Sequence, residues 1–331
     1  MDRHPLGNSG PLVTPIGLGL AALGRPGYIN LGHADDLPGN RTVEALKQRT
    51  GRVLDAAWDA GIRYVDVARS YGRGEEFLGQ WLRSRDIDPT EITVGSKWGY
   101  TYTADWKVEA DVHEVKDHSL ATLERQWPAS HNHLGEYLDL YQIHSATLKT
   151  GVLDDAAVHR ALADLKEKDV AIGLSLSGPH QADTLEKALG IAIDGVPLFD
   201  AVQATWNVLE RSAGPMLAAA HEDGRGVIVK EALANGRLTP RNDDPAFRET
   251  YDVLQAEADR LQTTVDALAL AAALHQPWAD VVLSGAARVS HLRSNARAVD
   301  VAWDEAAEEA LSGLSEAPSS YWTTRDALSW T

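Results

Sequence analysis

The sequence contains no cysteine. This absence excludes disulfide bonds, thiolate nucleophiles and zinc sites of the cysteine type, and it fits a reducing compartment. No stretch approaches the ~18 apolar residues of a membrane helix, and the N-terminus lacks a cationic segment that leads into an apolar core. We therefore expect an unsecreted, soluble, cytoplasmic protein with no membrane partner.

Positive charge is also scarce. The 331 residues include 31 Lys and Arg against 48 Asp and Glu, which gives a formal net charge of −17. Such a chain repels phosphate polyanions unless a local basic patch compensates, and here the lysines and arginines are scattered singly. We therefore expect no nucleic-acid partner. No group of histidines or acidic residues reaches three ligands at metal spacing, so we also expect no metal.

Short apolar runs alternate with amphipathic or alanine-rich stretches along the whole chain. The runs predicted as strands are Ile16–Leu20, Ile62–Val67, Ile92–Gly95, Leu138–Ile143, Ala171–Leu176, Ala201–Ala204, Gly226–Val229 and Asp280–Leu283. The stretches predicted as helices are Thr42–Ala60, Glu75–Arg85, Val112–Trp127, Asp154–Lys168, Ala182–Leu189, Ala213–His221, Ala246–Gln276 and His291–Val299. This alternation predicts parallel βαβ units, and eight of them make a closed (β/α)8 TIM barrel. Because no linker interrupts the alternation, we expect one domain over residues 1–331.

Two segments lie outside this alternation. Residues 6–13 have apolar pairs on either side of Asn8-Ser9-Gly10, which predicts an N-terminal β-hairpin that plugs the barrel floor. At the other end, the polar stretch Ser315–Thr331 contains large aromatic residues, namely Tyr321, Trp322 and Trp330. Large aromatic side chains need a surface to cover, so we expect an ordered C-terminal tail.

Catalytic residues of barrel enzymes lie at the C-terminal ends of the strands. Asp66, Lys97 and His144 end three successive predicted strands, and Tyr71 lies in the loop that follows the first of them. Carbonyl reduction needs a proton donor at the oxygen, and the ordinary pKa of tyrosine, about 10, is high for this task. We expect the Lys97 ammonium, balanced by Asp66, to lower the pKa of Tyr71. The alternative is a merely structural Asp66–Lys97 ion pair.

The residues around these positions form long motifs. GIRYVDVARSYGRGEEFLG at Gly61–Gly79, followed by SKWG at Ser96–Gly99 and LDLYQIH at Leu138–His144, closely resembles the aldo-keto reductase superfamily. The resemblance extends from residue 6 to residue 295. It implies a (β/α)8 barrel, no metal, usually NADP(H) as cofactor, and a catalytic tetrad of Asp66, Tyr71, Lys97 and His144 in which Tyr71 is the general acid.

The resemblance also implies a cofactor site. Its residues would be Gly19, Leu20, Asp66, Ser175, Gln203, Lys230, Leu233, Gly285, Arg288, His291 and Asn295. The match is incomplete, because Lys230 stands where the family commonly has an aromatic that stacks on the nicotinamide. Either its alkyl stem covers that ring or its ammonium reaches a cofactor phosphate. Arg288 lies in the segment that binds the 2′-phosphate, which favours NADP(H), with NAD(H) as the alternative.

Trp98, Trp206 and Trp322 belong to a group of aromatic residues near the predicted mouth, and we expect them to line a substrate pocket. The alternative is that they pack beneath a lid. The predicted function is interconversion of an aldehyde or ketone, possibly an aldose, with its alcohol. A cofactor-binding regulatory subunit similar to the potassium-channel β-subunits is the alternative function. The physiological substrate, the direction of reaction and the oligomeric state stay open.

Overall fold

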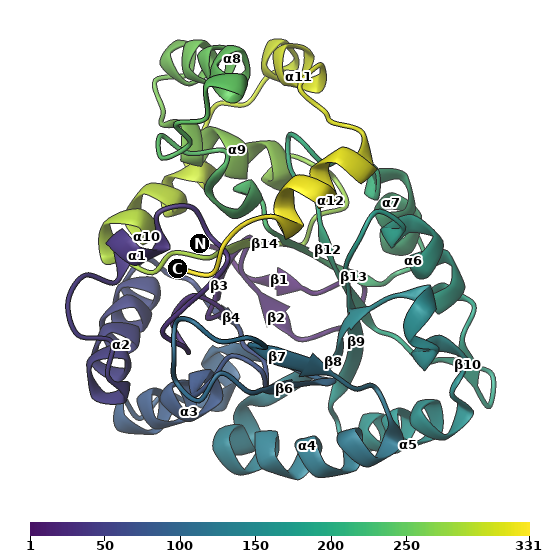
Figure 1. Cartoon of the computed structure of the whole chain (residues 1–331). Helices are drawn as coiled ribbons and strands as arrows, with labels where there is room; N and C mark the ends of the chain where they lie inside the picture. The colour runs from purple at the N-terminus through teal and green to yellow at the C-terminus, as the bar shows by residue number, and fades with distance from the viewer.

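The computed structural model describes residues 1–331 and contains a closed barrel of parallel strands (Figure 1). In chain order the barrel strands are β3 (Ile16–Gly19), β4 (Tyr64–Asp66), β5 (Thr93–Trp98), β8 (Leu138–Ala146), β9 (Ala171–Leu176), β12 (Ala201–Thr205), β13 (Gly226–Lys230) and β14 (Val281–Ser284). Nearly every residue in these strands is buried, because the barrel interior covers one face and the helices cover the other. The predicted eight-stranded barrel is therefore confirmed.

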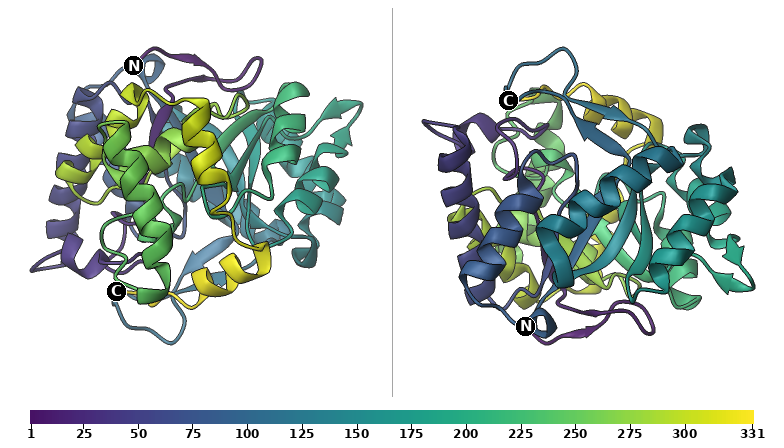
Figure 2. Two further views of the ribbon diagram at one scale, coloured as in Figure 1. Left: turned by 90° about the horizontal axis from the view of Figure 1, so that it is seen from above. Right: turned by 90° about the horizontal axis from the view of Figure 1, so that it is seen from below.

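Helices surround the barrel, most of them in a ring (Figures 1 and 2). They are α1 (His33–Asp36), α2 (Val43–Asp59), α3 (Gly74–Ser84), α4 (Leu120–Leu134), α5 (Ala156–Lys166), α6 (Gln181–Leu189), α7 (Gly214–Glu222), α8 (Arg248–Arg260), α9 (Val265–Leu274), α10 (Val289–Ala296), α11 (Glu305–Ser312) and α12 (Pro318–Asp326). Side-chain oxygens cap several N-termini: Thr42 accepts a hydrogen bond from Ala45 N, and Ser119 accepts one from Thr122 N. These caps explain where α2 and α4 begin.

Two predicted helices have different bounds in the structure. The stretch Ala246–Gln276 was expected to be one helix, but it forms α8 and α9, and the chain turns between them with Gln262 at a φ of 53°. A left-handed residue interrupts the helical hydrogen bonds there. The stretch Val112–Trp127 was also expected to be one helix. Its first part instead includes strand β7 (Glu114–Lys116), which pairs with β6 (Tyr100–Tyr102), and α4 begins only at Leu120.

The N-terminal hairpin closes the barrel floor, as predicted. Its strands β1 (His4–Pro5) and β2 (Leu12–Val13) pair in antiparallel register, and Leu6 and Val13 join a small apolar cluster with floor residues such as Ile228. The hairpin and the C-terminus lie at opposite ends of the molecule (Figure 2).

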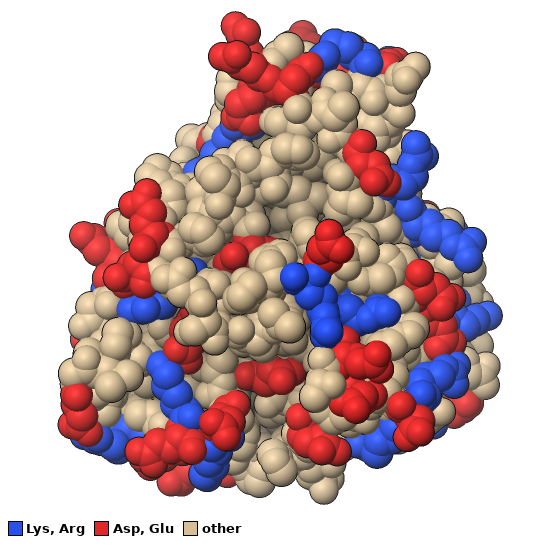
Figure 3. Space-filling model, turned by 180° about the vertical axis from the view of Figure 1, so that it is seen from behind, with Lys and Arg blue, Asp and Glu red and all other residues tan.

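The floor face carries interspersed acidic and basic side chains (Figure 3). None of the helices has the length and apolarity needed to cross a membrane.

The C-terminal tail is ordered and lies over the barrel mouth. In α12, Tyr321 and Trp322 are buried, which satisfies the expectation that these aromatics cover a surface. Farther along, the Trp330 ring stacks on His113 with centroids 4.0 Å apart. The backbones of Thr331 and Tyr28 exchange two hydrogen bonds of 3.3 Å each. The tail therefore joins the loops that follow β3 and β5 in a wall around the mouth. A third small hairpin, β10 (Ala192–Ile193) with β11 (Val196–Pro197), lies at the periphery.

Candidate active site

A cavity of about 740 Å³ opens at the mouth of the barrel. Its walls come from the ends of the strands, from the loops after β3 and β13, from α10 and from the C-terminal tail. We call the part of the cavity lined by Asp66, Tyr71 and His144 its inner part, and the part lined by Asp36 of α1 and His291 of α10 its outer part. The volume lies in the range of small-molecule and cofactor sites.

Asp66 and Lys97 form a fully buried ion pair at the base of the cavity. Their side chains are 3% and 0% exposed, and Lys97 Nζ also donates a hydrogen bond of 3.0 Å to the Val67 carbonyl oxygen. Asp66 accepts a second strong hydrogen bond, of 2.8 Å, from Gln203 Nε2. Burial lowers the pKa of Lys97, and the Asp66 carboxylate opposes that shift. A buried charge needs such a partner, because its desolvation is costly.

Tyr71 lies next to this pair. Lys97 Nζ is 5.2 Å from the centre of the Tyr71 ring, whereas it contacts Asp66 directly. Burial raises the pKa of Tyr71 well above its usual value, and the Asp66 charge raises it further. Burial and the Asp66 charge therefore outweigh the effect of the Lys97 ammonium, so the expectation of a net lowered pKa is wrong. The phenol therefore keeps its proton at neutral pH and has a proton to donate.

His144 faces Tyr71 across the cavity, with the two rings 5.5 Å apart in an edge-on arrangement. Burial lowers the pKa of His144 well below its usual value, and the positive charge of Lys97 lowers it further. The imidazole is therefore neutral at pH 7. Its Nδ1 lies 3.4 Å from Ser70 Oγ, and Tyr100 packs against the ring at 4.9 Å. A neutral, fixed imidazole can form a hydrogen bond with a carbonyl oxygen without adding charge.

Most residues that the sequence predicted for the cofactor line this cavity. They are Gly19, Asp66, Gln203, Lys230, Leu233, Gly285, His291 and Asn295. A methyl group added at Gly285 would meet no atom within 4 Å, so this glycine borders open space. Asn295 is held by a hydrogen bond of 2.8 Å to Ser284 Oγ. These positions leave room for an extended dinucleotide between the tetrad and α10.

Other predicted residues do not line the cavity. Leu20 is completely buried, and the Ser175 hydroxyl accepts a hydrogen bond of 2.8 Å from Ser145 N, so that Ser175 supports a residue that does line it. Arg288 is not itself in the cavity wall, and its guanidinium donates hydrogen bonds to the backbone carbonyl oxygens of Asp35 and Asp36 beside that wall.

The three tryptophans expected in the substrate pocket are also absent from its wall. Trp98, Trp206 and Trp322 are 0%, 2% and 3% exposed, and none of them borders the cavity. Trp98 packs on His118 and Trp206 on Trp278, at 5.8 Å and 5.6 Å between ring centroids. Their large apolar surface is covered beneath the loops, so the expectation for these three residues is wrong.

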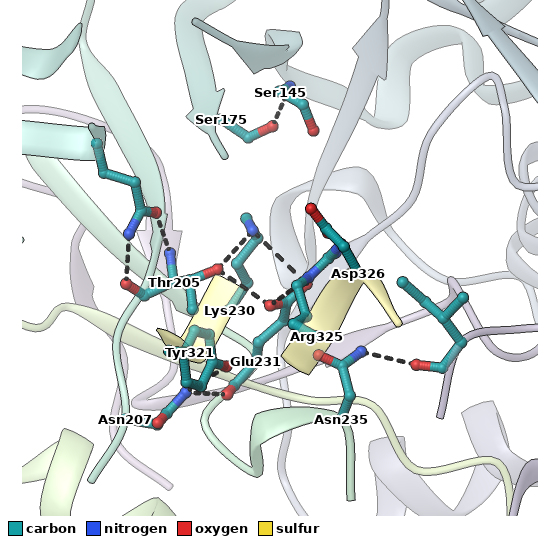
Figure 4. Close-up of polar contacts among 12 residues, drawn as sticks. Ser145, Ser175, Thr205, Asn207, Lys230, Glu231, Asn235, Tyr321, Arg325 and Asp326 are labelled. Atoms are coloured by element: carbon teal, nitrogen blue, oxygen red, sulfur yellow. Dashed lines mark hydrogen bonds and ion pairs between the residues drawn. The ribbon is translucent and has the colours of Figure 1, made fainter. Parts of the chain in front are cut away.

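Lys230 belongs to a buried charged cluster at the cavity edge (Figure 4). Its Nζ donates a hydrogen bond of 2.7 Å to Thr205 Oγ1 and lies 3.8 Å from Glu231 Oε1. On the far side of Glu231, Arg325 of α12 donates a hydrogen bond of 2.7 Å to the same carboxylate. Burial lowers the pKa of Lys230 to about 8, against the attraction of Glu231. The ammonium of Lys230 is thus directed at Thr205 and Glu231.

Sequence reasoning missed several lining residues, among them Arg25, Tyr28, Asp36 and Arg241. Arg25 is 3% exposed, its Nη1 donates a hydrogen bond of 2.8 Å to Glu114, and its guanidinium lies 5.3 Å from the Tyr71 ring centre. These residues lie in loops or, for Asp36, in the four-residue helix α1, where no periodicity or motif marks them. The one usable signal was that the loop after the first strand reaches the mouth of a barrel.

The comparisons with known proteins agree with this geometry. The model of the aldo/keto reductase family matches residues 15–315. D-threo-aldose 1-dehydrogenase of a Pseudomonas species is 26% identical, over 91% of this chain and 97% of its own length. The NADH-specific methylglyoxal reductase of Escherichia coli is 25% identical, over 96% and 99%. A solved aldo-keto reductase of Bacillus halodurans, in its holo form, has a TM-score of 0.72 at 22% identity and covers 96% of this chain and 97% of its own.

Fold, site and relatives together define a barrel oxidoreductase. The family match covers nearly all of the chain, far more than a shared motif would. This protein belongs to the aldo/keto reductase family.

Proposed function

We propose that this protein is an enzyme that interconverts an aldehyde or ketone and its alcohol with a nicotinamide cofactor, and that Tyr71 is its general acid and base. One observation carries the proposal: the Tyr71 phenol, the neutral His144 imidazole and the buried Asp66–Lys97 pair meet at the inner part of one cavity. This set supplies a proton, an orienting hydrogen bond and a fixed charge at one point. Nothing in it favours the regulatory-subunit alternative.

The residues have distinct roles in this proposal. When bound, a nicotinamide dinucleotide exchanges a hydride with the carbonyl carbon. Tyr71 keeps its proton because burial raises its pKa, and it donates that proton to the carbonyl oxygen. His144, neutral for the same physical reason, orients that oxygen. Lys97 is held by Asp66 near the phenol, where its positive charge stabilises the phenolate that donation leaves behind.

The chain's own residues fit a dinucleotide. Gly19 and Gly285 give the backbone close approach, Gln203 offers its amide, and Leu233 and Asn295 complete the wall. Both NADP(H) and NAD(H) are candidates, and Arg288 is the sequence-based reason to favour NADP(H). The cytoplasm is the proposed location, since a chain without cysteine fits a reducing compartment. The relatives that act on an aldose and on methylglyoxal make small hydroxylated or dicarbonyl compounds the first substrates to test.

The experiment is Tyr71→Phe, which removes the proton donor and keeps the ring. We expect kcat to fall by at least ~100-fold on an active aldehyde or aldose, as is typical of losing a general acid, while the Kd of the cofactor stays nearly constant. Tyr251→Phe is the matched control, because its hydroxyl contacts Gln255 on α8, outside the cavity. Turnover close to wild type in Tyr71→Phe would overturn the assignment.

A further inference from the structure

The outer part of the cavity holds one carboxylate surrounded by basic side chains. Arg241 contacts both carboxylate oxygens of Asp36, at 2.8 Å from Nη1 and more closely from Nη2. Arg288 Nε lies 3.3 Å from the same carboxylate, and His291 Nδ1 lies 3.6 Å from it. The Asp36 side chain is only 4% exposed, yet it borders the cavity together with Arg241 and His291.

Three loops that are distant in sequence supply this group. Asp36 ends α1 in the segment after β3, Arg241 lies in the segment after β13, and Arg288 caps α10 after β14. Figure 1 shows α1 and α10 side by side at the edge of the mouth. The tetrad lies at the inner part of the same cavity. A dinucleotide with its nicotinamide at Tyr71 would extend along this cavity, and its adenosine end would then lie among these residues.

Asp36 lowers the net charge of the outer part of the cavity. Arg241 and Arg288 carry two permanent positive charges, while burial lowers the pKa of His291 and keeps its ring neutral at pH 7. Against them stand Asp36 and Asp266, which also borders the cavity. These four charged side chains together carry no net charge, and Arg41 and Arg49 lie behind them, where they donate hydrogen bonds to backbone carbonyl oxygens of residues 34, 36 and 37. Without Asp36 the same residues would carry a surplus of one.

We propose that Asp36 determines cofactor selectivity, because its carboxylate competes with the 2′-phosphate of NADP(H) for Arg241 and Arg288. The inference rests on the proposed function. A phosphate monoester carries a charge of about −1.5 to −2 at pH 7 and forms strong hydrogen bonds with guanidinium groups. To reach these arginines, the phosphate must displace the Asp36 carboxylate from them. The two negative groups then lie side by side and repel each other. The ribose hydroxyls of NAD(H) face no such repulsion, and a carboxylate accepts their hydrogen bonds.

The wild-type enzyme should therefore gain little from the 2′-phosphate. We expect the dissociation constants of NADPH and NADH to lie within about tenfold of each other, although two arginines lie at the site. In Asp36→Asn, which keeps the shape and removes the charge, NADPH should bind at least about tenfold more tightly. NADH should change by less than about threefold, because its ribose hydroxyls can bond to an amide as well as to a carboxylate.

The test measures both dissociation constants by tryptophan fluorescence without any substrate, so it does not depend on turnover. Asp35→Asn is the matched control: it removes the same charge one residue away on the same short helix, where the side chain is exposed. Equal tightening of both cofactors in Asp36→Asn, or no tightening of NADPH, would overturn the inference. So would a wild-type preference for NADPH above about 100-fold. Should Asp36→Asn not fold, Asp36→Ser and the wild-type ratio decide the question.

A failure of the inference is distinguishable from a failure of the proposed function. If wild type binds neither dinucleotide, the proposed function itself is wrong. If wild type binds both, and the variants leave the ratio unchanged, only the role of Asp36 is wrong. Arg241→Met gives a further check, since loss of this guanidinium should weaken NADPH more than NADH in the Asp36→Asn background.

Discussion

Replacing Arg325 with methionine should destabilise the protein by breaking the link between the C-terminal helix and the barrel mouth. Arg325 donates hydrogen bonds to both oxygens of Glu231, at 2.7 Å and 3.2 Å. The Glu231 side chain is only 8% exposed, so water cannot replace the guanidinium. The substitution leaves the Glu231 carboxylate with Lys230, 3.8 Å away, and Thr205 as its remaining polar partners.

The pKa of Glu231 gives the sign and the order of magnitude of the loss, because Arg325 is the largest of the groups that lower it. Burial raises this pKa, but Arg325 and then Lys230 outweigh burial and lower it from 4.5 to about 2. The difference corresponds to about 3 kcal/mol of folding free energy. Because the folded-state pKa is the lower one, this stabilisation is complete above pH 4.5 and is lost as the pH falls toward 2. We expect Arg325→Met to cost about 3 kcal/mol at pH 7, in line with other broken buried pairs.

Thermal and urea unfolding, followed by tryptophan fluorescence, measure this loss. With an unfolding entropy of about 2.1 cal/mol/K per residue, ~3 kcal/mol lowers the Tm of 331 residues by about 4 °C. Arg160→Met is the control, because it breaks the Arg160–Asp194 pair, in which both side chains are more than half exposed. That control should leave the free energy of unfolding nearly unchanged. The double variant Glu231→Gln with Arg325→Met should recover only part of the loss, because it removes the unpaired Glu231 carboxylate but also removes the anionic partner of Lys230.

Two results would refute this reasoning. The first is a stability of Arg325→Met within ~0.5 kcal/mol of wild type, which would show that Glu231 does not depend on the arginine. The second is a double variant that loses the full sum of the two single losses, which would show that the residues are not coupled.

Two further predictions concern the cavity. Lys97→Met should lower kcat by ~100-fold or more, because the phenolate of Tyr71 loses its nearby charge and Asp66 is left unpaired; a variant that merely unfolds at lower temperature while keeping its kcat would make the pair structural only. Lys230→Met should tighten NADP⁺ relative to NADPH at pH 7, since the ammonium repels the oxidised ring. This difference should shrink above pH 8, where wild-type Lys230, with a pKa of about 8, loses its charge; equal weakening of both cofactors would instead place Lys230 on a phosphate.

Local pattern was enough to predict the barrel and the tetrad. Strand and helix periods are set by which faces are buried, so the alternation of apolar runs predicted all eight barrel strands. Asp66, Lys97 and His144 could be placed together because the C-terminal ends of the parallel strands all lie at the same end of the barrel. The break between α8 and α9 was missed, since a single left-handed residue such as Gln262 leaves no trace in the hydrophobic period.

Long-range packing decided the rest. The sequence by itself determined which residues could perform acid–base chemistry, but the high pKa of Tyr71 comes from its burial and from Asp66, which are set by the assembled barrel. Only the tertiary structure brought Asp36 to Arg241, and Glu231 to Arg325, because each contact joins two segments that are more than 90 residues apart in the sequence. Likewise, the burial of Trp98 away from the cavity depended on where its ring packs, which no local pattern encodes.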